Sequence, residues 1–180
     1  MVTGDDNVKQ QAKNGCAVKC QQLILRDYGF EIGETELSEL AKRNGWYREG
    51  EGVFMRNNGK LLGCFGIQYH HLQDNTVEDI ARELQQGHRV MVNVNADKLH
   101  EGPEVTFRHY EATHAVLISM VNGEFVFFID PMTGNIDEPC HISWFENAWQ
   151  DSFCYMLATE CPARYRYDPT TQSMIELLTF

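Results

Sequence analysis

Three side chains of this sequence could together activate a nucleophile: Cys16, His114 and Asp130. A cysteine attacks as its thiolate, and a helix N-terminus favours that anion because N–H groups and the helix dipole lower the thiol pKa. Cys16 stands at such a point, since Gly15 permits a sharp turn before the amphipathic segment 16–28. Position alone favours a structural cysteine over a nucleophile, because free cysteine is among the most buried residue types.

A general base for the thiol is predicted at the start of a distant strand. His114 begins the apolar run "HAVLISMV", and Asp130 ends the next one, "EFVFFID". Between them, Asn122-Gly123 predicts a type I′ hairpin whose centre, residue 122, is the midpoint of 114 and 130. We therefore expect His114 and Asp130 level with each other at one end of adjacent strands, where the acid can fix the imidazole tautomer. Singly, each has a structural explanation, as a hydrogen-bonded strand-edge histidine and a turn-starting aspartate.

The oxyanion that develops during acyl transfer needs fixed N–H donors. The backbone N–H of Cys16 can supply one, and a glutamine just upstream can supply the other. Gln10 lies six residues before Cys16 and Gln11 lies five. The spacing leaves both glutamines as candidates.

The elements that must position these residues are helices first and strands afterwards. Apolar periodicity and end signals predict helices over 16–28, 35–44 (with Thr35 as N-cap), 61–65, 76–86 and 143–149. Capping boxes are expected for Thr76 with Asp79 and for Ser143 with Glu146. Strands are predicted over 67–72, 89–95, 114–121, 124–130 and 153–159. This order indicates one α+β domain over 1–160, with a mostly antiparallel sheet covered on both faces, followed by a tail over 161–180.

The order of the motifs resembles that of the papain-like cysteine peptidases. A glutamine is followed by a cysteine at a helix start, by His-Ala-Val opening a strand, and by Asp-Pro ending the next strand. More closely, the chain is similar to the bacteriocin-processing peptidase family, which removes double-glycine leader peptides, and to its stand-alone relatives. The segments "LILRDYGFEIGETELSELAKRNG", "IARELQQGHRVMVNVN" and "SWFENAWQDSFCYMLA" extend the resemblance over residues 8–159.

The resemblance implies a papain-like fold, in which a helical lobe packs on a lobe of antiparallel strands and a cleft lies between them. It implies that Cys16 is the nucleophile, that His114 is the general base, that Asp130 orients His114 and that Gln10 donates to the oxyanion. The implied reaction hydrolyses a peptide or amide bond of a peptide or protein substrate through a thioester. Ala17 departs from the family, in which glycine often follows the cysteine; alanine is also small and a good helix former.

Other functions are compatible with the same residues. An acyltransferase or a deamidase would use the same triad with another acceptor or substrate, and a non-catalytic binding module would keep the fold without an activated thiol. A zinc site is a weaker alternative, because structural zinc ligands usually show tighter paired spacing. Its ligands would be Cys16 and Cys20 with either Cys140 and His141 or His70 and His71. "NNGKLLGCFG" lacks the GxxxxGK pattern of a nucleotide loop, and we expect neither a cofactor nor a metal.

The polar stretch "NADKLHEGPEVTFRH", residues 95–109, is long for a plain connection. Together with His109, Tyr110 and Glu111 it could border the cleft. An ordinary surface insertion is an equally good interpretation.

The composition of the chain indicates which classes of partner it can bind and in which compartment it is located. The 180 residues have a net charge of −11 and a pI near 5, which argues against nucleic-acid binding because phosphate contacts need clustered Lys and Arg. No apolar run reaches the roughly 18 residues of a membrane span. The N-terminus is polar and acidic, unlike a signal peptide, and six scattered cysteines favour a reduced, cytoplasmic protein. A signal removed ahead of residue 1 would leave the location open, and the sequence fixes neither the substrate nor the oligomeric state.

Overall fold

The computed structural model describes residues 4–102 and 114–178. Its helices are α1 (Cys16–Asp27), α2 (Glu34–Arg43), α3 (Lys60–Cys64), α4 (Val77–Gln85), α5 (Ala96–Glu101) and α6 (Ile142–Trp149), with the 3₁₀ turns η1 (Met55–Asn57) and η2 (Gln150–Ser152). Its strands are β1 (Tyr47–Arg48), β2 (Gly52–Val53), β3 (Tyr69–Leu72), β4 (Val90–Val94), β5 (His114–Val121), β6 (Phe125–Asp130), β7 (Asn135–His141), β8 (Met156–Thr159), β9 (Tyr165–Asp168) and β10 (Ser173–Glu176).

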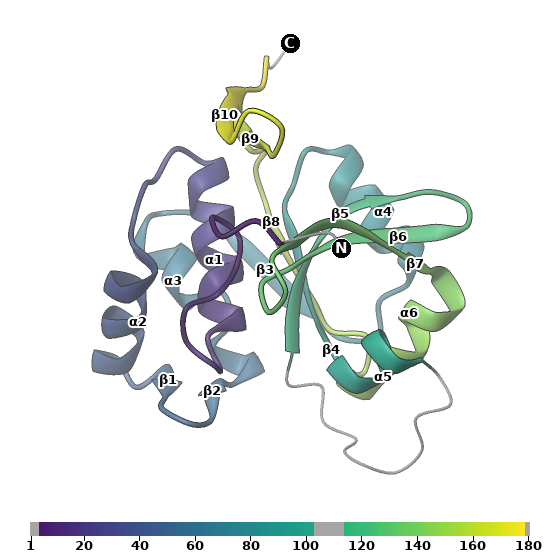
Figure 1. Cartoon of the computed structure of the whole chain (residues 1–180), viewed down its shortest axis with the longest axis horizontal. Helices are drawn as coiled ribbons and strands as arrows, with labels where there is room; N and C mark the ends of the chain where they lie inside the picture. The colour runs from purple at the N-terminus through teal and green to yellow at the C-terminus, as the bar shows by residue number, and fades with distance from the viewer. Residues whose placement is uncertain (1–3, 103–113, 179–180) are drawn as a thin grey trace.

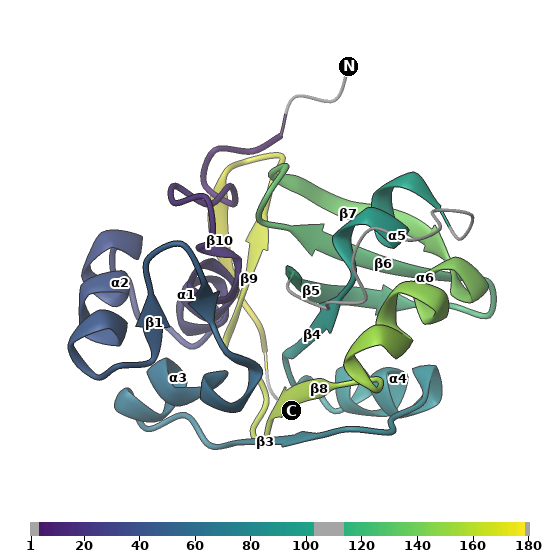
Figure 2. The same ribbon diagram turned by 90° about the horizontal axis from the view of Figure 1, so that it is seen from below.

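Six of the strands form one antiparallel sheet in the order β3-β8-β4-β5-β6-β7. Helices α1, α2 and α3 gather on one side of this sheet and form a helical lobe with the small β1-β2 hairpin (Figure 1). The sheet and the helices α4, α5 and α6 form the second lobe, the β lobe (Figure 2). This is the α+β architecture expected from the sequence, with helices first and an antiparallel sheet afterwards.

The central strands are buried on both faces, as their continuous apolar runs predicted. All five residues of β4 are buried. Met91 belongs to the core shared with the helical lobe, whereas Val90 and Val92 belong to the core under α4 and α6. Ala115 and Val116 of β5 divide between the two cores in the same way. The period-two alternation of a strand therefore serves two cores at once.

Helix α1 lies at the junction of the two lobes because it is apolar on most of its surface. Leu23, Ile24 and Leu25 are all buried in the core that includes Leu117 of the sheet. The buried side chain of Gln21 also faces inward, where its Oε1 accepts hydrogen bonds from N–H groups at the start of α3. The helix begins at Cys16, so burial of α1 fixes the position of that residue beside β5.

The turn between β5 and β6 differs from the expected type I′ hairpin. Neither Asn122 nor Gly123 has the positive φ that a type I′ turn requires. Oδ1 of Asn122 instead accepts hydrogen bonds from the backbone N–H groups of Glu124 and Phe125, at 2.8 and 2.6 Å. The Asn side chain closes the loop in place of the left-handed backbone, which is a recognised way for Asn to form turns.

Two predicted helix caps are wrong, and one is confirmed. The N-cap of α2 is Gly33, and Thr35 lies inside the first turn. The N-cap of α6 is His141, whose side chain accepts from the N–H of Ser143, so that no capping box with Glu146 forms. The capping box of α4 is present as predicted from its sequence.

The predicted strand over 153–159 is shorter than expected, and one strand of the six-stranded sheet was not predicted. Phe153 and Cys154 both adopt positive φ values, so β8 begins only at Met156. The unpredicted strand of this sheet is β7, which contains Pro139 and pairs only with β6 at the sheet edge. Proline is tolerated on edge strands because no second neighbour needs its N–H. The short strands β1, β2, β9 and β10, outside this sheet, were not predicted either.

The segment after Cys161 folds as the β9-β10 hairpin and packs near α1 (Figure 1). The backbone N–H of Arg164 donates to the carbonyl of Asp27, at the end of α1. The hydroxyl of Tyr167 donates to Oδ2 of Asp5 at 2.7 Å, which joins the hairpin to the N-terminal segment. Among the helices of the described residues, none is long and apolar enough to cross a membrane.

Candidate active site

Cys16 is the first residue of α1 and is 9% exposed. Burial alone raises a thiol pKa, but hydrogen bonding to the side chain of His114, the charge of that imidazole, and hydrogen bonds from the backbone of Ala115 and Ala17 outweigh it and lower the pKa of Cys16 below its ordinary value. Burial raises the pKa of Cys20, one turn further on, well above the ordinary value. The surroundings of the two thiols thus shift their pKa values in opposite directions.

His114 begins β5, is 5% exposed, and lies between the thiol and an acid. Its Nε2 is 2.8 Å from Oδ1 of Asp130, which leaves Nδ1 for the hydrogen bond with Cys16. Burial by itself lowers the pKa of an imidazole, but the hydrogen bonds and the charges of Asp130 and Cys16 raise the pKa of His114 to about 9. At neutral pH this arrangement favours an imidazolium beside a thiolate.

Asp130 ends β6 and is fully buried. Burial raises the pKa of a carboxyl, but the close imidazoles of His100 and His114, the charge of His114 and the N–H of Met132 hold the pKa of Asp130 well below its usual range. The carboxyl is therefore a carboxylate that can orient an imidazole. The sequence predicted this proximity, although the register that produces it is not the expected one.

His100, on the short helix α5, was missed by sequence reasoning. Its Nε2 lies 2.9 Å from Oδ2 of Asp130, the oxygen that His114 does not contact. This is an ion pair when His100 is protonated, but Oδ2 accepts no well-aligned hydrogen bond. The sequence signal was the start of α5, where Asn95 caps the helix, inside the polar stretch expected to border the cleft. His109, Tyr110 and Glu111, from the same stretch, lie outside the described residues.

The two candidate glutamines occupy different places. Gln10 lines a cavity of about 150 Å³ together with Cys16 and His114. Gln11 is exposed, and its backbone N–H donates to the carboxylate of Glu34. Nε2 of Gln10 donates to the carbonyls of residues 12 and 13, at 2.8 Å each, so both amide hydrogens are engaged in this state. The position favours Gln10 over Gln11, and donation to an oxyanion requires its amide to turn.

A buried ion pair supports the segment that leads into Cys16. Nζ of Lys19 lies 3.8 Å from Oε2 of Glu34, and both side chains are almost fully buried. The same carboxylate accepts the N–H of Gln11 through both oxygens, at 3.0 and 3.1 Å. Glu34 therefore ties α2 to α1 and to the turn before Cys16. The backbone N–H of Gln10 is held from the other lobe, by the carbonyl of Pro131 at 2.7 Å.

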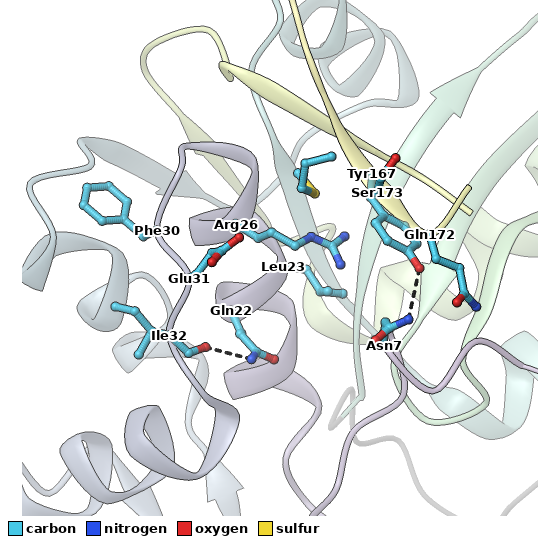
Figure 3. A pocket seen from close by; sticks show the side chains of 11 residues that line it. Asn7, Gln22, Leu23, Arg26, Phe30, Glu31, Ile32, Tyr167, Gln172 and Ser173 are labelled. Atoms are coloured by element: carbon cyan, nitrogen blue, oxygen red, sulfur yellow. Dashed lines mark hydrogen bonds between the residues drawn. The ribbon is translucent and has the colours of Figure 1, made fainter. Parts of the chain in front are cut away.

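Larger cavities lie away from the candidate residues. One, of about 370 Å³, lies between the outer face of α1 and the β9-β10 hairpin, where Arg26 stacks over the ring of Tyr167 (Figure 3). Another, of about 450 Å³, lies beside it and is lined in part by Arg89. Neither includes Cys16, His114 or Asp130, so cavity size alone would not have found the site.

The predicted zinc alternatives are not brought together. Among the described residues, one set of potential ligand atoms lies mutually within 4.8 Å, and it consists of His100, His114 and Asp130. In that set the carboxylate already faces an imidazole nitrogen on each oxygen. The arrangement is that of an acid between two histidines. All six cysteines are thiols.

No family model and no curated protein matches the chain. Solved structures do match it. A putative C39-like peptidase from Bacillus anthracis superposes with a TM-score of 0.66 at 16% identity, covering 87% of this chain and 94% of that one. The peptidase domain of Streptococcus ComA, a bi-functional ABC transporter involved in a quorum sensing pathway, gives 0.63 at 12% identity, covering 86% and 96%.

A third match is a double glycine motif protease from an AMS/PCAT transporter, in complex with its leader peptide. It superposes with a TM-score of 0.56 at 11% identity, covering 84% of this chain and 89% of that one. The chain therefore has the fold of C39-like and double-glycine peptidase domains, as the order of its motifs predicted. At these identities the likeness establishes the fold alone, and the chemistry must be argued from the residues.

Proposed function

We propose that the chain is a cysteine peptidase that hydrolyses a peptide or amide bond through a thioester at Cys16. The observation that supports this proposal is the position of His114, which is hydrogen-bonded to both Cys16 and Asp130. A peptidase fold, an activated thiol at a helix N-terminus and an oriented imidazole together meet the requirements for covalent acyl transfer.

In the proposed reaction His114 holds the thiol proton, and the thiolate of Cys16 attacks the substrate carbonyl carbon. The oxyanion is stabilised by the backbone N–H of Cys16 and by the amide of Gln10 after it turns away from the 12–13 carbonyls. The imidazolium protonates the leaving amine, which leaves a thioester. His114 then takes a proton from water, the hydroxide attacks the thioester, and the Cys16 thiolate departs. Asp130 keeps Nε2 of His114 protonated and directed throughout.

Peptide cleavage is the direct test. Because a structural neighbour was solved with a leader peptide, a first probe is a set of peptides with a double-glycine motif, run beside an unbiased peptide library and analysed by mass spectrometry. We expect cleavage by the parent protein and none by Cys16→Ala, with Cys20→Ala as the matched control that retains activity. Cleavage that persists in Cys16→Ala would overturn the proposal.

Thiol reactivity tests the same site without a substrate. At pH 6, iodoacetamide should alkylate Cys16 at least about tenfold faster than the other five cysteines, because the imidazole of His114 helps to lower the pKa of the Cys16 thiol. Uniform slow labelling would favour the non-catalytic alternative. Turnover with water as the only acceptor distinguishes hydrolysis from transfer, since a peptidase then releases a free carboxylate whereas a transferase needs an added amine acceptor, and ammonia release from glutamine peptides would identify a deamidase.

A further inference from the structure

We infer that His100 is a positioning residue for the proposed reaction: it holds the second oxygen of Asp130 and so fixes the acid that orients His114. This inference rests on the proposed function, because it assigns a role within that site. The imidazole ring centre of His100 lies 6.1 Å from that of His114, and both imidazoles contact the carboxylate of Asp130.

The two carboxylate oxygens of Asp130 have different numbers of partners. Oδ1 contacts Nε2 of His114 and accepts the backbone N–H of Met132, at 2.8 and 2.9 Å. Oδ2 is buried, and within the described residues its only polar partner is Nε2 of His100. The 2.9 Å contact with the imidazole of His100 offsets part of the cost of burying this carboxylate oxygen, so loss of His100 would drive Asp130 to rotate or admit water. Either change would disturb the hydrogen bond to His114.

Helix α5 is held firmly enough to serve this purpose. Nδ2 of Asn95 and Nζ of Lys98 donate to the two carboxylate oxygens of Asp151, at 2.8 and 2.9 Å. Nε1 of Trp144 donates to the carbonyl of Leu99 at 3.0 Å. These contacts attach the start and the middle of a six-residue helix to α6 and η2. His100 therefore approaches Asp130 from a rigid support, which is what precise orientation of a catalytic group requires.

The test compares two substitutions of similar shape. His100→Gln keeps an N–H donor near the position of Nε2, whereas His100→Met keeps the length and removes the donor. We expect His100→Met to lower kcat about 10- to 100-fold, the loss that corresponds to one hydrogen bond to a charged group, with KM within about twofold. His100→Gln should return kcat to within about threefold of the parent. Glu101→Ala, at the exposed next position, is the control and should match the parent.

A second readout requires no substrate. Alkylation of Cys16 by iodoacetamide at pH 6 should be about tenfold slower in His100→Met than in His100→Gln, because a misoriented His114 no longer stabilises the thiolate. If His100→Met and His100→Gln have the same kcat and the same rate of Cys16 alkylation, His100 does not have this role. The same conclusion holds if both variants lose activity equally. If the parent cleaves no peptide the proposed function fails, while the alkylation comparison still decides whether His100 positions the His114–Asp130 pair. Thermal unfolding of each variant confirms that folded proteins are compared.

Discussion

His114 and Asp130 are in contact although they do not face each other across the strand pair. Leu117 pairs with Ile129, so residue 130 falls level with residue 116, two positions along β5 from His114. A long side chain can still reach a diagonal neighbour, and Nε2 of His114 lies 2.8 Å from Oδ1 of Asp130. The irregularity between Ile118 and Met120 shifts the register near the turn. A contact between side chains thus survives a register that differs from the predicted one.

The raised pKa of His114 predicts the alkaline limit of activity. The imidazolium exists below about pH 9, and the lowered pKa of Cys16 favours the thiolate beside it. We therefore expect kcat/KM to be high around pH 7 and to fall as the pH rises through about 9, when the group that protonates the leaving amine is lost. The check is kcat/KM on a cleaved peptide from pH 5 to 10.5. A rate that continues to rise beyond pH 10 would contradict an imidazolium acid.

Asp130→Asn should lower the pH of the alkaline limit of activity and slow the reaction. The substitution keeps the shape of the side chain but removes the charge that helps to raise the pKa of His114, and it permits the wrong imidazole tautomer. We expect kcat to fall at least about 100-fold and the alkaline limit to move toward 6.5. Asp137→Asn, an exposed acid on β7, is the control. An unchanged pH profile in Asp130→Asn would show that the carboxylate does not act on His114.

The two glutamines can be separated by single substitutions. Gln10→Ala should reduce kcat about 100- to 1,000-fold, the usual loss for one oxyanion donor, with a small change in KM. Gln11→Ala should leave kcat within about twofold, because that side chain is exposed and, among the described residues, its one hydrogen bond is the 3.4 Å contact that it accepts from the Thr35 hydroxyl. Steady-state kinetics on one peptide measures both. The opposite pattern would transfer the role to Gln11.

The buried pair of Lys19 and Glu34 should contribute to stability. Glu34→Ala leaves a buried ammonium without its carboxylate, which we expect to lower the free energy of unfolding by about 3 kcal/mol. The double variant Lys19→Met with Glu34→Leu should lose less, because it removes both charges and keeps apolar volume. Urea unfolding at pH 7 measures the difference. Equal stability of Glu34→Ala and the parent would mean that the pair is not coupled in the folded protein.

Apolar periodicity was sufficient to predict most of the framework. It located α1, α4 and the strands β4, β5 and β6 because each buries a regular set of side chains. It missed β7, whose polar residues and Pro139 give no strand signal and which exists because β6 offers an open edge. The Asn-Gly turn was located correctly but with the wrong geometry, because Oδ1 of Asn122 accepts hydrogen bonds from the backbone in place of a left-handed turn. The cap of α2 was placed two residues late, at Thr35, because the helix begins after Gly33 without a side-chain cap.

Sequence reasoning likewise found some residues of the candidate site and missed others. The sequence was enough to predict one site that contains Cys16, His114 and Asp130. A single hairpin relates His114 to Asp130, and the start of a helix marks Cys16. His100 could not be predicted in this way, because its contact with Asp130 joins α5 to the end of β6 through packing rather than through any local pattern. The choice between Gln10 and Gln11 likewise depends on how one short segment lies against the second lobe.

Gln10 is anchored to the β lobe, whereas Cys16 starts a helix of the other lobe. The carbonyl of Pro131 holds the backbone of Gln10, and Asp5 is bound both by Gly134 and by Tyr167. The proposed oxyanion donor is therefore tied to the β lobe by its backbone and to the segment before Cys16 by its side chain. A substrate would have to draw the Gln10 amide away from the 12–13 carbonyls as it binds, so that selectivity would lie in induced fit as much as in the shape of any one pocket.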